Sequence, residues 1–344
     1  MDQADLRNQL HHISDVLLER EASGEALLNA VRTLSALLEN LSPVKYRDPL
    51  TDPDREGTRL AQGEAVSPSC AARCSIEPLR VARFVQGVEQ AIRIAQSRFP
   101  NGTLHLLYAG TGPYATLVMP LLTRYSPAQL QLTLLDYHAE SLDSVRSVLS
   151  ALGFDAFARG YVQADASQYH HPQDDPIHIA VSETMAAGLQ KEMQVPITLN
   201  LAPQLAEGGI WLPQVVRVNV VLAEPREFLV GIDYTTPPPY PVSADVHSVA
   251  TVFEIDARNP ASLAKPHAEH LPAAGFESPS MPGSGLELFL TTEIIIYDDI
   301  VLTGRDSTLN HPLCPAIKSA NPTASRLQFS YRLGQSPGLE AVAE

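Results

Sequence analysis

The chain has 344 residues, and its 39 aspartates and glutamates outnumber its 24 lysines and arginines, giving a formal net charge of −15. This balance argues against a nucleic-acid-binding protein and against a protein that binds anionic membranes, because both partners are held by clustered Lys and Arg. Hydrophobic residues make up 44% of the chain and charged residues 18%, so we expect a folded protein of one large or two ordinary domains.

Targeting signals and metal sites are not expected. The first seven residues carry two aspartates and no apolar core, and no run of about 18 apolar residues follows, so neither a signal peptide nor a membrane span is predicted. Cys70, Cys74 and Cys314 form neither an even disulfide framework nor a metal-binding spacing with histidine. His170-His171 lies among Pro and Asp and is interpreted as a solvated turn. A reducing, cytoplasmic location is the default expectation.

The N-terminal part predicts helices and then a long connection. Apolar residues recur at helical spacing from Leu6 to Leu41 and the pattern breaks at Ser23-Gly24, which predicts a helical hairpin. Between residues 42 and 73 the pattern gives way to Pro, Gly and charged residues. A connection of this length is usually a lid or a disordered connector, and both interpretations stay open. Residues 1–75 are therefore expected to form a helical hairpin and a lid loop.

Strands and helices alternate in the next part, residues 76–210. A helix is predicted from Pro78 to Gln96. The strands that follow are expected at 104–108, 130–136, 158–163 and 177–181, and the helices at 114–124, 141–152 and 194–205. Strands separated by helices of this length predict a parallel, doubly wound sheet of the Rossmann-like type.

From Trp211 onward, β-branched runs are separated by Pro-rich turns with little helix between them. The runs occupy residues 215–222, 247–255, 286–297 and 327–333. They predict an antiparallel β-barrel-like or sandwich domain over residues 211–344. The expected fold class is thus α/β, with N-terminal helices, a Rossmann-like doubly wound domain and a C-terminal antiparallel β domain.

The sharpest local motif is an apolar strand that passes through Tyr108 and Ala109 into Gly110-Thr111-Gly112. Glycines at a strand-to-helix turn let a ligand approach the backbone closely. A motif this short also occurs in ordinary tight turns, so it is weak alone. The turn carries no Lys, Arg or Ser suited to phosphate, which favours a nucleoside ligand without phosphate.

Two aspartates strengthen the interpretation as an adenosine site. Asp136 ends the next expected strand, where a carboxylate can accept both hydroxyls of a ribose. Asp165, followed by Ala166, comes after the third strand, where a carboxylate can meet an adenine amino group. A helix cap or solvated turn is the alternative for Asp165.

This order of motifs resembles class I S-adenosylmethionine (SAM) dependent methyltransferases, which implies SAM as cofactor or as substrate. The segment from Ser182 to Glu192 is similar to the double-glutamate loop of protein arginine methyltransferases, in which two Glu residues stand nine positions apart, as Glu183 and Glu192 do here. The resemblance implies that these two carboxylates hold a cationic nitrogen and orient its lone pair. Two surface acids on a turn are the alternative interpretation.

The resemblance also assigns further residues. Glu77-Pro78-Leu79-Arg80 occupies the place of the family's Asp-x-x-Arg segment, so Arg80 is the expected partner of the SAM carboxylate, with a helix-surface Arg as the alternative. Asn200, on the helix after the loop, joins Glu183 and Glu192 as a catalytic candidate. The full set of expected cofactor-binding residues is Arg80, Tyr108, Gly110, Gly112, Asp136, Tyr137, Asp165 and Ala166.

One departure disfavours a protein-arginine substrate: the family's Thr-His-Trp loop has no counterpart, because no Thr-His pair is present and the only tryptophan is Trp211. Together with the N-terminal additions, this makes the chain similar to bacterial azetidine-2-carboxylate synthases of nonribosomal peptide pathways. That resemblance implies that SAM itself cyclises and that methylthioadenosine is released.

Three functions therefore stay open. The preferred one is a SAM-dependent enzyme that acts on a small amino-acid-type substrate, with cyclisation of SAM narrowly preferred. The others are N-methylation of arginine or another amine, and a non-catalytic SAM-binding protein. The expected partner is a small molecule rather than nucleic acid or a membrane, and the resemblance to barrel enzymes that dimerise adds a homodimer as an expectation.

Overall fold

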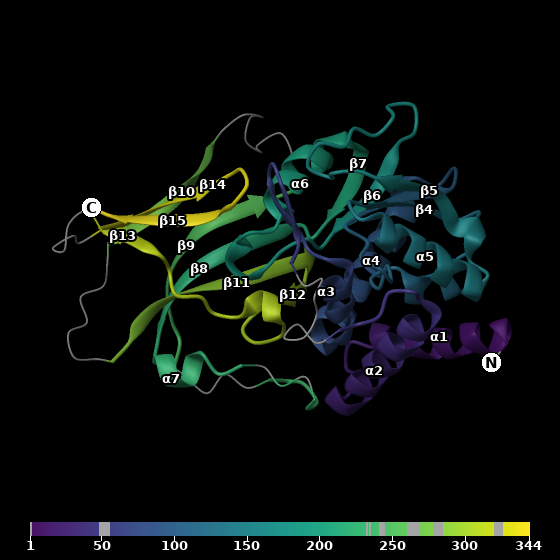
Figure 1. Cartoon of the computed structure of the whole chain (residues 1–344), viewed down its shortest axis with the longest axis horizontal. Coiled ribbons are helices and arrows are strands. Elements are labelled where there is room, and N and C mark those ends of the chain that lie inside the picture. The colour runs from purple at the N-terminus through teal and green to yellow at the C-terminus, as the bar shows by residue number, and fades with distance from the viewer. Residues whose placement is uncertain are drawn as a thin grey trace.

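A parallel sheet of five strands, in the order β5-β4-β3-β6-β7, lies on the right of Figure 1 in this computed structural model. The strands are β3 Leu104–Ala109, β4 Leu130–Asp136, β5 Ala158–Gln163, β6 Ile177–Ser182 and β7 Leu205–Leu212. The order runs outward from β3 to β5 and then reverses to β6 and β7, as in doubly wound folds. Such folds bind ligands at the carboxyl ends of the strands beside the reversal.

The structure describes residues 2–47, 56–231, 233, 235–240, 245–259, 269–277, 285–319 and 326–344. Within them, the helices predicted at 78–96 and 141–152 are confirmed as α4 Pro78–Arg98 and α5 Ala139–Leu152. The four predicted strands of the parallel sheet are confirmed as β3 to β6. The predicted α/β fold class is therefore confirmed.

The helix predicted at 114–124 is wrong. Residues 110–129 contain the short 3₁₀ helix η2 Met119–Thr123 between turns. Pro120 offers no N–H for an α-helical hydrogen bond, and Ala115 has a positive φ of 46°, outside the right-handed helical region. The periodic spacing of apolar residues there reflects burial of an irregular segment.

The boundary after the next helix also differs from the prediction. The helix expected at 194–205 ends earlier, as α6 Gln194–Leu201, followed by the 3₁₀ helix η5 Ala202–Gln204. Leu205 then begins β7, which pairs in parallel with β6. Trp211, expected to open the β domain, therefore belongs to the central sheet.

The N-terminal hairpin is confirmed as α1 Gln3–Leu18 and α2 Gly24–Leu41. The Ser23 side chain accepts a hydrogen bond from the backbone N–H of Ala26 and so caps the second helix. Both helices pack against α4 and α5, and their buried leucines join the core cluster of the parallel sheet. The hairpin is therefore an integral layer of the fold.

The described part of the long connection is folded. It contains the hairpin β1 Thr58–Leu60 and β2 Gly63–Ala65, the short helix α3 Pro68–Ala72 and the 3₁₀ helix η1 Arg73–Ile76. We call residues 56–76 the cover. Of the two interpretations left open for residues 42–73, an ordered lid agrees with this segment, while residues 48–55 lie outside the described residues.

The C-terminal part contains two four-stranded sheets, ordered β12-β11-β8-β9 and β10-β14-β15-β13. The strands of the first are β8 Val215–Ala223, β9 His247–Asp256, β11 Glu287–Tyr297 and β12 Ile300–Leu302. Those of the second are β10 His270–Glu277, β13 Ile317–Ser319, β14 Arg326–Arg332 and β15 Gly338–Ala343. Apart from the parallel pair β13–β15, neighbouring strands are antiparallel, as predicted.

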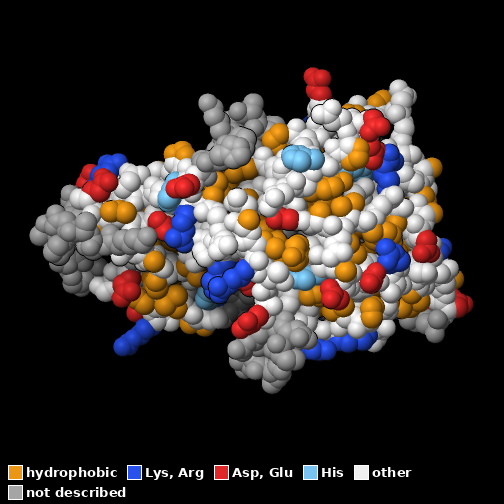
Figure 2. Space-filling model, turned by 45° about the horizontal axis from the view of Figure 1, so that its top comes forward, with side chains coloured by type: hydrophobic (Ala, Val, Ile, Leu, Met, Phe, Trp, Pro, Cys, Tyr) orange, Lys and Arg blue, Asp and Glu red, His pale blue; other side chains and the backbone are white. Residues whose placement is uncertain are grey.

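Four further short elements are described: the 3₁₀ helices η3 Asp155–Phe157 and η4 Ala187–Leu189, α7 Pro225–Phe228 after β8, and the 3₁₀ helix η7 Thr308–Asn310 after β12. Among the described residues no helix combines the length and apolar character needed to cross a bilayer. On the face in Figure 2, acidic and basic side chains are interspersed among apolar ones, without a single large basic patch.

Candidate active site

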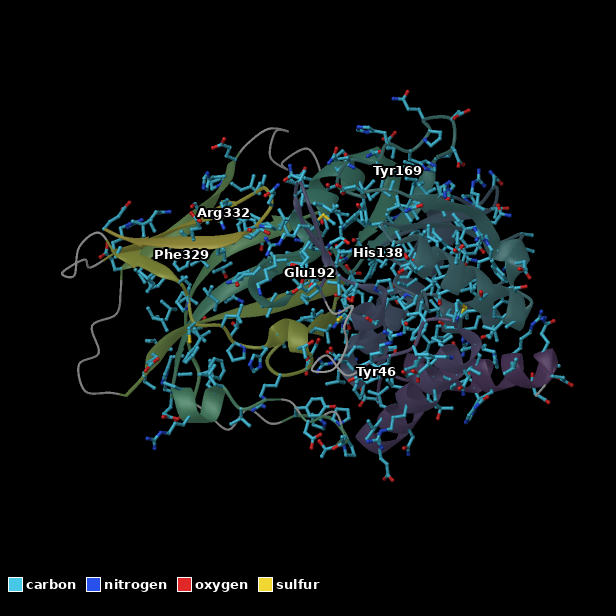
Figure 3. All side chains as sticks on the ribbon, in the orientation of Figure 1. Tyr46, His138, Tyr169, Glu192, Phe329 and Arg332 are labelled. Carbon is cyan, nitrogen blue, oxygen red and sulfur yellow. The ribbon has the colours of Figure 1, made fainter. Side chains whose placement is uncertain are left out.

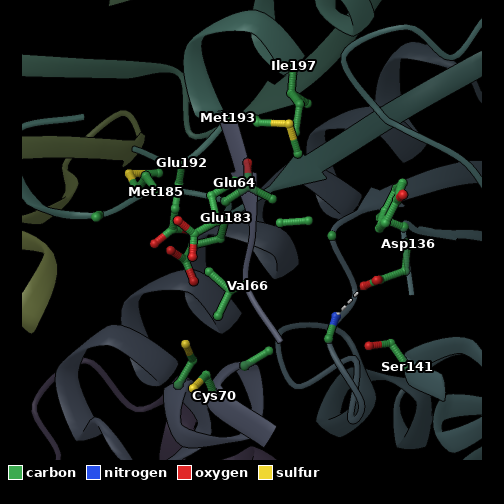
Figure 4. Close-up of a pocket in the computed structure, with 18 of the residues that line it drawn as sticks. Glu64, Val66, Cys70, Asp136, Ser141, Glu183, Met185, Glu192, Met193 and Ile197 are labelled. Atoms are coloured by element: carbon green, nitrogen blue, oxygen red, sulfur yellow. Dashed lines mark hydrogen bonds between the residues drawn. The ribbon is translucent and has the colours of Figure 1, made fainter. Parts of the chain in front are cut away.

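A cavity of about 430 Å³ lies at the carboxyl ends of β3, β4 and β6, between the parallel sheet and the cover (Figure 4). In Figure 3 two of its residues, His138 and Glu192, lie near the centre of the molecule. Its acidic lining residues outnumber its basic ones, five to two. They are Glu64, Glu77, Asp136, Glu183 and Glu192 against Arg73 and Arg80. This lining favours a ligand that carries positive charge.

The glycine turn after β3 forms one wall. Gly110 and Gly112 have positive φ values of 76° and 55°. A Cβ atom at Gly110 would lie 2.4 Å from Cγ2 of Thr184, so the turn after β3 and the loop after β6 are in close contact. The turn therefore stands beside the reversal of strand order, where the sequence predicted a ligand.

Asp136, at the end of β4, binds this turn directly. Its Oδ2 accepts hydrogen bonds from the N–H of Gly112 at 3.0 Å and from Oγ1 of Thr111 at 3.3 Å. Its Oδ1 accepts one from the N–H of His138 at 2.9 Å. The carboxylate is mostly buried, yet it lines the cavity, so it both shapes the turn and faces the ligand space.

Other expected cofactor residues lie at different depths. Tyr137 lines the cavity beside Asp136, and Ala166 lines it from the loop after β5. Tyr108 is buried in a small adjoining cavity of about 60 Å³ that it shares with Arg80 and Glu183.

Asp165 and Asn200 do not line the cavity. Asp165 accepts hydrogen bonds from the N–H and hydroxyl of Ser167, as in the turn-capping alternative. The amide of Asn200 donates to the carbonyl oxygens of Ala166 and Tyr169, both at 2.9 Å. Asn200 thus anchors the loop that carries Ala166 into the cavity wall.

Arg80 lies at the centre of a buried ion network. Its Nη1 donates to Oε1 of Glu77 at 3.0 Å, and its Nε donates to Oε2 of Glu183 at 3.1 Å, with a second bond from Nη2 to the same oxygen. All three side chains are at most 7% exposed. The helix-surface alternative for Arg80 is therefore wrong, because α4 turns this residue inward.

Glu77 links this network to the β domain. Its carboxylate accepts hydrogen bonds from the hydroxyls of Ser307 at 2.8 Å and Thr308 at 2.6 Å, and from the N–H of Thr308 at 3.0 Å. Burial opposes its charge, but Arg80 and these donors outweigh burial and lower the pKa of Glu77 below its ordinary value. Glu77 is consequently a charged anchor, fully engaged by its surroundings.

The pKa values of Glu183 and Glu192 are shifted upwards, opposite to the pKa of Glu77. Burial raises the pKa of Glu183, although Arg80 counteracts part of the shift. Burial, and then the charge of Glu183, raise the pKa of Glu192 to about 8. The two carboxyl groups converge in Figure 4, so their mutual repulsion adds to burial in favouring the protonated form of Glu192.

The loop that carries them, residues 183–192, is held in a strained conformation. Leu189 and Lys191 have positive φ values of 55° and 67°, which bulky residues rarely adopt. The β domain holds the loop: the Tyr331 hydroxyl donates to the carbonyl of Leu189 at 2.8 Å, and the N–H of Lys191 donates to the carbonyl of Pro337 at 2.9 Å. Contacts with the C-terminal strands therefore help to determine the position of the two glutamates.

The cover is attached at both ends of the cavity. The N–H of Glu64 donates to the carbonyl of Lys191 at 2.9 Å, next to Glu192. At the other end, Oγ1 of Thr58 lies 3.2 Å from Nε2 of His138, which follows Asp136. The β1–β2 hairpin thus extends from the expected adenosine end to the double-glutamate loop.

We expect Gly63→Ala to detach the cover locally. Gly63 has a φ of 140°, and an added Cβ would lie 2.7 Å from Cγ of Met193 and 2.8 Å from the carbonyl of Lys191. Limited proteolysis should cut the hairpin 58–65 faster in this variant. Gly102→Ala is the control, because Gly102 has a similar φ of 128° and no atom within 4 Å of the added Cβ. Equal protection in both variants would contradict a docked cover.

One cluster of residues that could bind a metal lies away from the cavity. The sequence alone did not predict such a cluster. One ligand atom from each of His105, His171 and Asp175 lies within 4.8 Å of the others. His171 is nearly buried and bonds to Asp175, so the solvated-turn interpretation of His170-His171 is wrong for His171. Asp175 also pairs with Arg159, so the cluster is already joined by hydrogen bonds and ion pairs.

The sequence missed Glu64 and Thr308 as site residues. Glu64 stands in a segment without clear periodicity, and Thr308 comes from the β domain, far along the chain. The sequence also missed the cluster of His105, His171 and Asp175. His105 is far from the other two in the sequence, and the parallel pairing of β3 with β6 brings it close to the residues before β6. The charge of Glu64, in a segment whose pattern fits a lid or a connector, is the signal that the sequence offers.

Comparisons with known proteins add a likeness in fold. No protein-family model and no curated protein matches the chain. Among solved structures, the chain is similar to a Trypanosoma brucei PRMT1 enzyme-prozyme heterotetrameric complex with AdoHcy, at 13% identity and a TM-score of 0.48. The match covers 77% of this chain and 88% of that chain. Since a fold does not determine a function, the chemistry must come from the residues of the cavity.

Proposed function

We propose that this protein is a SAM-dependent enzyme that acts on a small substrate with a basic nitrogen. The observation that carries the proposal is the pairing of Glu183 and Glu192 in one cavity with Arg80 and the glycine turn. Perturbed carboxyl pKa values in a covered cavity are typical of catalytic sites. A non-catalytic SAM-binding role gives no reason to keep two such carboxyl groups together.

The residues present fit SAM. SAM is a nucleoside without phosphate that carries a sulfonium and an ammonium group, and the acidic lining suits those charges. Glu183 Oε1 is buried and has no hydrogen-bond partner among the described residues, so it offers an acceptor to a ligand donor. We propose that Asp136 and the glycine turn hold the adenosine part, with Tyr137 and Ala166 beside it.

We propose two roles for Arg80. Among the described residues, three of its five N–H groups bond to Glu77 and Glu183, which keeps Glu183 in one orientation. Its remaining N–H groups are the proposed donors to the carboxylate of the bound amino acid part. A planar, always charged guanidinium suits both tasks.

The glutamates provide the proposed proton chemistry. SAM, when bound, supplies a carbon next to a positively charged sulfur, which a neutral nitrogen can attack. Glu192, with its raised pKa, accepts the proton that the substrate nitrogen must lose. Glu183, fixed by Arg80, orients that nitrogen through its free oxygen. The cover lines one side of the cavity, and exclusion of water from that side would strengthen these interactions.

Cyclisation of SAM to azetidine-2-carboxylate, with release of methylthioadenosine, is the second candidate. The cover favours it, because a partly covered cavity suits a reaction that needs no large external acceptor. The same carboxyl group would then take the proton of the amino group of SAM itself. We place N-methylation of a small amine first, which reverses the order that the sequence favours, because it uses both glutamates as a site for a separate nitrogen.

Products separate the two reactions. Purified protein should be incubated with SAM alone and with SAM plus a set of small amines, and the products identified by mass spectrometry. S-adenosylhomocysteine formed only with an amine supports methyl transfer, and methylthioadenosine from SAM alone supports cyclisation. If SAM neither binds nor reacts, the proposal is wrong.

Asp136→Asn should weaken SAM binding by about tenfold or more, because a charged acceptor of hydrogen bonds is worth roughly 1.5–3 kcal/mol. In either orientation the amide also places a donor against a backbone N–H, that of Gly112 or that of His138. Asp165→Asn is the matched control, since that carboxylate bonds within its own turn, and it should change binding little. Titration calorimetry with SAM measures both, and an equal loss would reassign the adenosine site.

A further inference from the structure

Glu64, on the cover, is paired with Glu192, one of the two glutamates to which we assign the proton chemistry. Glu64 and Glu192 are partners in an isolated parallel bridge, and both side chains line the cavity. Bridge partners have their side chains on the same face, where like charges oppose each other unfavourably. The charge of Glu64 also contributes to the raised pKa of Glu192. Docking the cover therefore adds a further carboxyl group to the wall of the cavity that Glu183 and Glu192 line.

Of the two basic residues that line the cavity, Arg80 is the one whose charge acts on Glu192, and it is already engaged by other carboxylates. Arg80 already bonds to Glu77 and Glu183, and Glu77 is further engaged by Ser307 and Thr308. The Glu183 side chain is 6% exposed, and its buried Oε1 has no hydrogen-bond partner within the described ranges. An unpaired buried acceptor beside two further carboxyl groups requires a donor, and a cationic one would relieve the repulsion as well.

We propose that Glu64 determines substrate specificity by adding a third carboxylate to the cation site of Glu183 and Glu192. The cover then closes most firmly over a substrate whose cationic nitrogen lies among the three groups. This inference rests on the proposed function and names its substrate class.

The rest of the lining defines the remainder of that substrate. Met185, Met193 and Leu309 are buried apolar residues of the same cavity, near the glutamates. The cover is attached at Lys191 and beside His138, so the hairpin crosses the cavity. A small organic amine with an apolar body fits this space, whereas a folded polypeptide substrate would have to displace the cover.

Two SAM analogues test the role of Glu64 without knowledge of the natural substrate. S-adenosylhomocysteine has a neutral sulfur, whereas sinefungin has a carbon bearing an ammonium group in place of the methylsulfonium. That ammonium points to the position where the substrate nitrogen would react. Calorimetry should compare both ligands on the wild-type protein, on Glu64→Gln and on Glu56→Gln. Glu56 is an exposed cover residue outside the cavity lining, so it is a matched control.

We expect the wild-type protein to prefer sinefungin, and Glu64→Gln to reduce that preference by roughly five- to tenfold, the order for one partly buried charge pair. S-adenosylhomocysteine should bind both variants nearly as it binds the wild type, which also reports intact folding. An unchanged preference in Glu64→Gln, or an equal loss in Glu56→Gln, would overturn the inference. Absence of binding by both analogues to the wild type would instead overturn the proposed function.

Discussion

Replacing Glu192 by Gln is expected to lower SAM turnover by about 10²- to 10⁴-fold, the range associated with loss of a proton-transfer group. The amide is nearly isosteric but cannot accept the proton of the substrate nitrogen. The same change should make the protein more stable at alkaline pH, by about 1–3 kcal/mol, because a buried carboxylate near Glu183 and Glu64 is removed. Lower activity with higher stability distinguishes a catalytic group from a structural one.

The pH dependence follows from the raised pKa of Glu192. The folded protein holds this proton up to a pKa of about 8, whereas the unfolded chain releases it near the ordinary value of about 4.3. Between these values the folded state binds more protons, so its stability falls as pH rises and the full penalty is present above pH 8. The Gln side chain of Glu192→Gln does not titrate, so the stability of this variant does not fall with pH for that reason.

Urea unfolding of both proteins at pH 5 and pH 9 measures this difference. The two free energies of unfolding should be similar at pH 5 and diverge at pH 9. Turnover of the wild-type protein should rise with pH as the Glu183–Glu192 pair loses its proton. Glu56→Gln serves as the control in both measurements, and a stability gain that is independent of pH would speak against a protonated Glu192.

Much of the fold could be predicted because its elements have strong periodic patterns. The hairpin α1–α2 and the strands β3, β4 and β6 are long enough for their apolar spacing to identify them. The segment after the glycine turn has similar spacing but forms turns and a 3₁₀ helix, since Pro120 and the left-handed Ala115 prevent an α-helix. Spacing alone does not separate these two outcomes.

The sequence predicts the acidic residues of the site where they end or follow a strand of the parallel sheet. Asp136, Glu183 and Glu192 end or follow strands of one sheet, and the carboxyl ends of parallel strands meet at one edge. Glu64 reaches the same place through a bridge to Glu192, a tertiary contact between distant segments. The inward turn of Arg80 likewise depends on Glu77 and Glu183 together, so the sequence alone does not distinguish it from an Arg on the helix surface.

Replacing Arg80 by Ala is expected to have the largest effect on stability, a loss of about 3–5 kcal/mol. Removing one partner of a buried ion network leaves the others charged and without compensation, which costs more than the network contributes. Here Glu77 and Glu183 would lose the guanidinium that bonds to both. Arg93→Ala is the matched control on the same helix, since Arg93 is 66% exposed in its pair with Glu89, and it should cost less than about 1 kcal/mol.

Arg80→Lys separates the structural role of Arg80 from its role in positioning Glu183. Lysine restores a positive charge, so we expect it to recover at least part of the lost stability. It cannot bond to Glu183 through two N–H groups of one planar fork, so the orientation of that carboxylate should remain poorly defined. Urea unfolding and SAM turnover should therefore diverge, with stability partly recovered and turnover still reduced. Recovery of both to the same extent would mean that Arg80 provides charge alone.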